Sequence, residues 1–201
     1  MNRTRLAEHL RLNGAPRQVN VHERAVSDHA GAATLYHPNT PGRNHGQASL
    51  FAPTGATFEK FTVPTERLDQ AINHSPRLIK MDIEGAELEA IKGMTGLLQN
   101  DAPPLLVIEH NPETCATAGY APGDLLRELR RSNPHYQAHW IGWRLKPLDS
   151  ADIIDAITLQ GNILYRAANT GYSRDSNSTT QHHGLPKDKP EGSSAPNSYS
   201  R

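Results

Sequence analysis

Apolar residues in the middle of the chain follow a strand-like spacing and then a helix-like one. The apolar runs at 77–82 and 104–109 are typical of buried strands, and the segment 122–131 is typical of an amphipathic helix. A further helix is predicted at 86–98, where the residues at helical spacing are Leu88, Ile91, Met94 and Leu98. This alternation of strands with helices predicts an α/β fold whose sheet is mostly parallel and covered by helices.

Shorter elements flank this central region on both sides. The pattern predicts a helix at 4–12 that ends at Asn13–Gly14, and a short helix at 66–73 with Thr65 as its N-cap. Further strands are expected at 19–25, 33–36, 49–51, 60–63, 136–141 and 161–165. The segment 37–47 is rich in Pro, Gly and Asn, so it is expected to be a loop.

The composition changes near the C-terminus. From about Gly171 onward Ser, Asn, Thr, Pro, Gly and charged residues dominate, and Leu185 is the one large aliphatic residue. Such a segment buries too little apolar surface to offset the entropy of ordering it, which predicts disorder. The sequence therefore predicts a domain at 1–168 and a disordered tail at 169–201, and the tail accounts for much of the low mean hydropathy of -0.65.

Charge, cysteine content and hydropathy limit which partners and which cellular location are expected. The formal net charge is +0 and the sequence pI is about 7.2, so no basic surface favouring nucleic acid or an anionic membrane is expected. The single cysteine, Cys115, excludes an internal disulfide framework. The first residues lack the apolar core of a secretory signal, and no apolar run is long enough to span a bilayer. We therefore expect a cytoplasmic protein.

Two carboxylates follow the first central strand. Asp82 and Glu84 are spaced i and i+2, which places them on one side of an extended chain, and Gly85 then allows a sharp turn into the next helix. In open α/β sheets ligands bind outside the carboxyl ends of the strands. The alternative is that Glu84 and Glu87 simply favour the helix N-terminus, at about 0.3–1 kcal/mol each, and that Asp82 is a turn residue.

The second central strand also ends in chemically active residues. Glu109 and His110 would lie beside Asp82 if the two strands are adjacent, and either could act as a general base. They could equally be turn or capping residues before Asn111–Pro112. Lys80 shares a strand face with Asp82 and could form an ion pair or line the site.

The same residue types raise the question of a metal. Asp82, Glu84, Glu109 and His110 suit a divalent cation with oxygen ligands, as in a metal-dependent hydrolase. Their spacing fixes no coordination geometry, so no metal site is predicted. Cys115 has no activating neighbour in the sequence and is expected to be inert.

The segment Ile79-Lys80-Met81-Asp82-Ile83-Glu84-Gly85-Ala86-Glu87, followed by Ile91-Lys92-Gly93, resembles the FkbM family of S-adenosylmethionine-dependent methyltransferases. Supporting segments occur in the expected order, so that the resemblance covers roughly residues 5–166. It implies a Rossmann-like class I methyltransferase sheet with helices on both faces. It also implies S-adenosylmethionine as cofactor and O-methylation of a hydroxylated small molecule or sugar.

The resemblance also implies roles for individual residues. Asp82 or Glu84 would lie near the reacting hydroxyl, with Glu109 or His110 as the second choice of catalytic group. On the cofactor side, the adenine would be lined by Ala25, Ser27 and Asp28, and Asp82 would contribute at the same edge.

The family domain begins with a strand and a glycine-rich loop for the cofactor, followed by a second strand ending in an acidic residue. No segment of this sequence matches either element. The sheet is therefore expected to be incomplete at its N-terminal side, and either to close up or to keep a gap with unpaired backbone groups. A separate N-terminal fragment is an expected partner. The alternative function is a non-catalytic remnant or protein-interaction module of the same fold.

Overall fold

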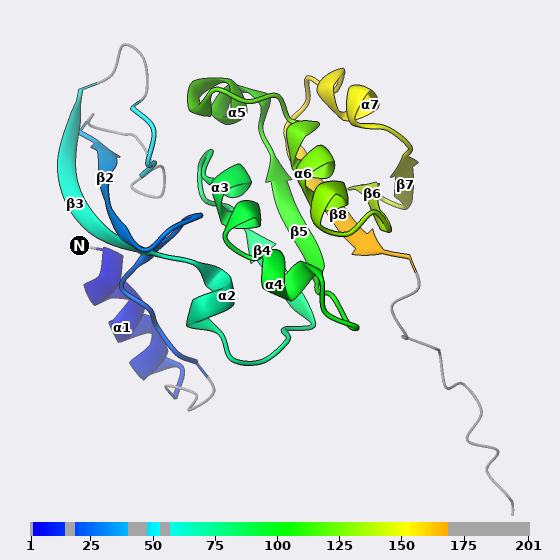
Figure 1. Cartoon of the computed structure of the whole chain (residues 1–201). Helices are drawn as coiled ribbons and strands as arrows, with labels where there is room; N and C mark the ends of the chain where they lie inside the picture. Colours follow the sequence, from blue (N-terminus) through cyan, green and yellow to red (C-terminus); the bar gives the residue numbers. More distant parts are fainter. Residues whose placement is uncertain (1, 15–18, 40–47, 53–56, 169–201) are drawn as a thin grey trace, which may run out of the picture. The chain divides into compact units, whose positions relative to one another are not determined.

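The computed structural model describes the chain except residues 1, 15–18, 40–47, 53–56 and 169–201. Residues Met1–Gly171 cluster as one compact unit. The helices are α1 (Asn2–Leu12), α2 (Leu68–Ala71), α3 (Glu87–Lys92), α4 (Thr95–Leu98), α5 (Pro112–Ala118), α6 (Asp124–Ser132) and α7 (Ala151–Asp155). The strands are β1 (Ala25–Val26), β2 (Gly31–Pro38), β3 (Phe58–Glu66), β4 (Leu78–Met81), β5 (Leu105–His110), β6 (Tyr136–Ile141), β7 (Leu145–Leu148) and β8 (Gly161–Ala167) (Figure 1).

Five strands form the larger sheet, in the order β4-β5-β8-β6-β7. The pair β4–β5 is parallel, with Met81 opposite Ile108, whereas β8 is antiparallel to both β5 and β6. The α/β class is confirmed. The prediction that the sheet is mostly parallel is wrong, because β6, β7 and β8 are joined by antiparallel pairing rather than by parallel crossovers.

One face of this sheet forms the core with helices α3, α4 and α6. The strand residues on that face alternate with exposed or half-buried ones, as for Leu106, Ile108 and His110 on β5. The buried residues of α6 are Leu125, Leu126 and Leu129, which match the predicted apolar stripe. Burial of each such side chain is worth about 1.5–3 kcal/mol, so this shared face is the main source of stability.

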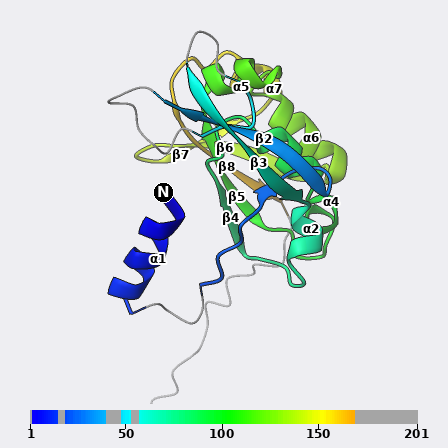
Figure 2. The same cartoon turned by 90° about the vertical axis from the view of Figure 1, so that its left-hand side faces the viewer.

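A second sheet has three strands in the order β1-β3-β2. β2 and β3 form a long antiparallel pair (Figure 2), and β1 pairs parallel to β3 through Ala25 and Val26. In the described part of the chain β1 makes no ladder with β4, so the two strands belong to different sheets. Of the two outcomes expected for an incomplete sheet, the structure shows the gap.

The gap is crossed by contacts at the carboxyl end of β1. The Ser27 hydroxyl donates to Glu89 of α3 at 3.4 Å, and the Asp69 backbone N–H of α2 donates to the Gly93 carbonyl at 3.1 Å. Arg67 joins the same network, because its guanidinium donates to the Asp28 carbonyl and to the Asp69 carboxylate. The first and second sheets are therefore linked through α2 and α3.

Several predicted boundaries need correction. The strand expected at 19–25 is reduced to β1, and 49–51 contributes a single bridge, Ser49 to Tyr36. Thr65 lies in β3 and caps no helix, since α2 begins after Arg67. The helix predicted at 86–98 is two helices, α3 and α4, interrupted at Gly93–Met94.

Three short elements were not predicted: α5, β7 and α7. Asn111 caps α5 by accepting hydrogen bonds from the backbone N–H groups of Glu113 and Thr114, with Pro112 in the first turn. The predicted loop at 37–47 and the predicted tail at 169–201 lie largely or wholly outside the described residues. None of the described helices combines the length and the apolar character needed to cross a membrane.

Candidate active site

Asp82 and Glu84 lie in the turn between β4 and α3. β4 ends at Met81, so Asp82 follows the strand instead of closing it. Glu84 adopts a left-handed backbone conformation with φ 53°, and Gly85 follows with φ 102°. Asp82 and Glu84 are thus brought to one side by a tight turn, and not by the alternation of an extended strand as the sequence suggested.

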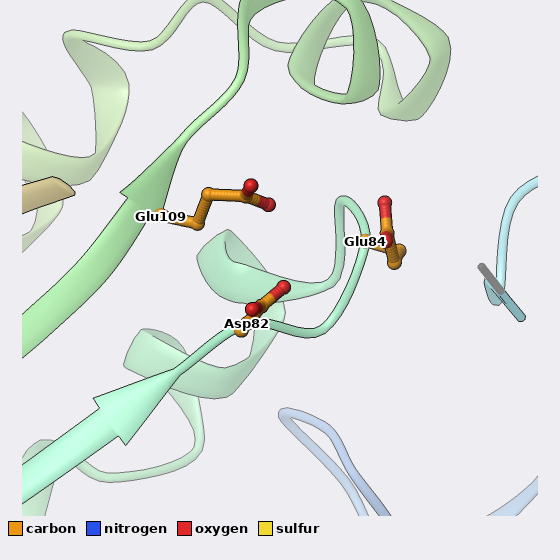
Figure 3. A group of neighbouring side chains, drawn as sticks. All are labelled: Asp82, Glu84 and Glu109. Carbon is orange, nitrogen blue, oxygen red and sulfur yellow. The ribbon is translucent and has the colours of Figure 1, made fainter. Parts of the chain in front are cut away.

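Three carboxylates meet at this turn. One carboxylate oxygen from each of Asp82, Glu84 and Glu109 lies within 4.8 Å of the others (Figure 3). Asp82 follows Met81, whose partner in the parallel pair is Ile108, and this register places Asp82 beside Glu109. The sequence predicted Glu109 beside Asp82 if the two strands are adjacent; β4 and β5 are adjacent, so this prediction is confirmed for Glu109.

Burial and mutual repulsion change the acidity of two members of this cluster. The pKa of Glu84 is raised, first by burial and then by the negative charges of Asp82 and Glu87. The pKa of Glu109 is raised by burial and by the charges of Asp82 and Glu84. A carboxylate with a raised pKa accepts a proton more readily near neutral pH, which is what a general base requires.

A cation could relieve the same repulsion. Carboxylate oxygens at these separations suit a divalent ion such as Mg²⁺. Lys80 provides a positive charge nearby. Its ammonium lies 3.9 Å from the Asp82 carboxylate and donates a hydrogen bond to the Met81 carbonyl at 2.9 Å. Both Lys80 and Asp82 are about half exposed, so water screens this ion pair.

Two groups that the sequence analysis did not assign to the site hold the turn in place. The Ser49 hydroxyl donates to the Glu84 carbonyl at 2.6 Å. The Glu87 carboxylate accepts hydrogen bonds from the backbone N–H groups on either side of Glu84, those of Ile83 and Gly85. Glu87 lies two residues after Gly85, in the first turn of the helix predicted at 86–98, and this position was the available signal for such a contact.

His110 is not brought to the carboxylates. It is 3% exposed and lies on the helix-covered face of β5, opposite to the face that carries Glu109. Its Nε2 donates to the Ile157 carbonyl at 3.1 Å, and burial lowers its pKa. Its ring also packs edge-on against Trp140, so the contacts of His110 are those of a core residue.

The residues expected on the cofactor side lie at the end of β1. Ala25 is half-buried, and Ser27 is 1% exposed with its hydroxyl directed to Glu89 and Asp28. The Asp28 carboxylate contacts His29 at 2.5 Å, which lowers the pKa of Asp28. Ala25 and Asp28 therefore keep surface that a ligand can reach, whereas Ser27 is covered.

Two other features lie apart from the cluster. Cys115 is buried, and burial raises the pKa of its thiol to about 11, in agreement with the expected lack of reactivity. A hollow of about 330 Å³ is lined by α2 and the following loop, including Asp69, Ile72 and His74. It contains none of the clustered carboxylates, and the Asp69 carboxylate is already bonded to Arg67.

Comparison with known proteins identifies the family. The sequence model described as Methyltransferase FkbM domain matches residues 2–136. The crystal structure of Methyltransferase FkbM from Methylobacillus flagellatus KT is similar, with 20% sequence identity and a TM-score of 0.49. The similarity covers 82% of this chain and 33% of that chain, so this chain spans about a third of its length. No curated protein matches.

Proposed function

Because the chain belongs to the FkbM methyltransferase domain family, we propose that it transfers a methyl group from S-adenosylmethionine to a hydroxyl of a small molecule or sugar. The observation that supports this site is the meeting of Asp82, Glu84 and Glu109 at the carboxyl ends of β4 and β5. Ligands bind at this edge in open α/β sheets.

The carboxylates fit the acceptor side of the reaction. A hydroxyl oxygen attacks the methyl carbon, so the new C–O bond forms as the C–S bond breaks, and the hydroxyl proton must leave. Asp82 or Glu84 would accept that proton, with Glu109 as the next candidate, because all three present oxygens to one space. Positioned proton transfer of this kind contributes typically about 10²–10⁴-fold to a rate.

His110 does not face the carboxylate cluster. Its Nε2–H is directed to the Ile157 carbonyl, and its ring is enclosed on the opposite face of the sheet. A role for His110 in the reaction would therefore have to act through the packing of β5. We propose Asp82, Glu84 and Glu109 as the groups that face the acceptor.

The residues present fit only part of the cofactor. S-adenosylmethionine, when bound, supplies an electrophilic methyl group and a neutral thioether leaving group. Asp28 and Asp82 carry partly exposed carboxylates that can accept hydrogen bonds from amine or hydroxyl donors, and Ala25 offers apolar surface to a ring. Ser27 would act by fixing Asp28 and Glu89, since its own hydroxyl is covered.

The test of the activity uses methyl-labelled S-adenosylmethionine with a panel of hydroxylated acceptors. We expect Asp82→Asn and Glu84→Gln each to lower kcat by about 10²–10⁴-fold while cofactor binding, measured by calorimetry, is retained for Glu84→Gln. Glu59→Gln is the control, because Glu59 is an exposed carboxylate on β3, in the other sheet. Wild-type rates in both site variants would remove the assignment.

A second candidate function has an observation of its own. In the described part of the chain β4 pairs only with β5, so its other edge is unpaired, and Leu78 on that strand is 55% exposed. An unpaired edge can accept a further strand. The strand could come from a separate N-terminal fragment, and the chain would then be an interaction module or one part of the enzyme.

Calorimetry separates the two functions. Heat on titrating the purified chain with S-adenosylmethionine supports a self-sufficient methyltransferase. The absence of heat, together with normal folding, supports the interaction module.

A further inference from the structure

Glu87 is a buried acid whose two carboxylate oxygens accept hydrogen bonds from the neighbouring turn. It is 3% exposed and occupies the first position of α3. Its Oε1 accepts from the Ile83 N–H at 3.1 Å and its Oε2 accepts from the Gly85 N–H at 3.0 Å. These two N–H groups flank Glu84, so one carboxylate holds the peptide units on both sides of it.

A tyrosine from another element completes this arrangement. The Tyr120 hydroxyl, just after α5, donates to Glu87 Oε2 at 3.0 Å. Burial and the charge of Glu87 raise the pKa of Tyr120, so the phenol keeps its proton and acts as the donor. The Glu87 side chain is thereby fixed from α5 as well as from its own turn.

The turn needs such a constraint. Left-handed backbone is unfavourable for a residue with a Cβ, and Glu84 adopts it with φ 53°. Its neighbour Gly85 is closely packed against α5, because a Cβ there would meet the Thr114 carbonyl at 3.1 Å and Ala118 at 3.2 Å. A strained conformation persists when the surrounding contacts over-determine it.

We propose that Glu87 and Tyr120 are positioning residues that hold the Glu84 side chain in the carboxylate cluster. The use of Glu84 as a reacting group rests on the proposed function, whereas its placement by Glu87 and Tyr120 does not. Neither positioning residue touches the acceptor: Glu87 acts through the backbone of the turn, and Tyr120 acts through Glu87.

The matched variants are Tyr120→Phe and Tyr136→Phe in the full chain. Each removes one buried hydroxyl that donates a hydrogen bond, to Glu87 in the first case and to the Pro104 carbonyl in the second. Only the first is connected to Glu84. The readouts are the NMR titration of the Glu84 side-chain carboxyl and the hydrogen exchange of the Ile83 and Gly85 amides.

The titration reports the surroundings of Glu84. The charged groups that face it are Asp82 of the same turn, Glu87 of α3 and Glu109 of β5, and Lys80 of β4 lies next to Asp82. In Tyr120→Phe we expect the Glu84 pKa to fall by roughly half a pH unit or more as its carboxyl leaves the cluster. Exchange of the two amides should become roughly tenfold faster.

In Tyr136→Phe both quantities should stay at their wild-type values, even though the fold loses a buried hydrogen bond. Wild-type Glu84 titration and amide exchange in Tyr120→Phe would overturn the proposal. Because neither readout requires turnover, failure to bind S-adenosylmethionine would contradict the proposed function and leave this inference standing.

Discussion

The carbonyl oxygen of Ser27 lies against the Cα of Gly93, so closely that a Cβ at Gly93 would be 2.0 Å from it. Ser27 follows β1 of the three-stranded sheet, and Gly93 ends α3, which packs on the five-stranded sheet. This approach of two backbones is part of the junction through which the sheets are linked.

Gly93→Ala should therefore destabilise the fold. The added methyl overlaps backbone, which cannot move aside as a flexible side chain can, and overpacking costs roughly 1–3 kcal/mol or more. Gly96→Ala is the control: its Cβ would meet nothing closer than 3.6 Å, and Ala within a helix gains about 0.5–1 kcal/mol over Gly. Urea unfolding measures the free energy of unfolding of both variants. If Gly93→Ala proved as stable as Gly96→Ala, that result would contradict the close contact at Gly93.

The conformation of Glu84 predicts an unusual order of stability between two variants. Glu84→Gly and Glu84→Ala both remove the carboxylate, but only Gly adopts φ 53° without a Cβ penalty. We expect Glu84→Gly to be the more stable by about 1 kcal/mol. At Arg127, inside α6, the order should reverse, with Ala more stable than Gly by about 0.5–1 kcal/mol. The same order at both positions would exclude the left-handed turn.

Because the pKa of Glu109 is raised, replacing Glu109 by a neutral residue should increase the stability of the fold by an amount that depends on pH. A carboxyl whose folded pKa lies above its unfolded pKa costs stability as pH rises through that interval, because the folded state then holds the proton more tightly than the unfolded state. Glu109→Gln should therefore stabilise the fold at pH 7, by a few tenths to about 1 kcal/mol since the group is partly hydrated.

Below the unfolded pKa of glutamate the advantage should vanish, because Glu109 is then protonated in both states. Thermal unfolding between about pH 3.5 and 8 checks this. Glu59→Gln, at an exposed site on β3, is the control variant. A constant effect of Glu109→Gln across the range would mean that neither burial nor the charges of Asp82 and Glu84 raise the pKa of Glu109 in the folded state.

Chelation distinguishes a base from a set of metal ligands. If Asp82, Glu84 and Glu109 act as acceptor-facing carboxylates, methyl transfer should proceed equally in EDTA and in millimolar Mg²⁺. The measurement is initial rate under both conditions, with the melting temperature recorded alongside. Loss of activity in EDTA and its recovery with Mg²⁺ would instead assign the three oxygens to a divalent cation, as a metal-dependent enzyme requires.

Local patterns in the sequence identified most of the central elements. β5 and β6 occur where their apolar runs predicted them, and α6 carries the expected stripe of Leu125, Leu126 and Leu129. Spacing could not reveal that 49–51 contributes a single bridge, from Ser49 to Tyr36, in place of a strand, or that Val19 and Val21 remain about half exposed. Strand formation depends on a neighbour in space, and alternation along the chain does not supply one.

The candidate site, too, was predicted only in part from the sequence. The sequence by itself determined the residue types at the strand ends, Asp82, Glu84 and Glu109, and the family to which they point. Only the tertiary structure decided that these three meet, that His110 lies on the other face, and that Glu87 and Tyr120 fix the turn. The reason is physical: side-chain direction and strand register depend on pairing and packing between segments far apart in the chain.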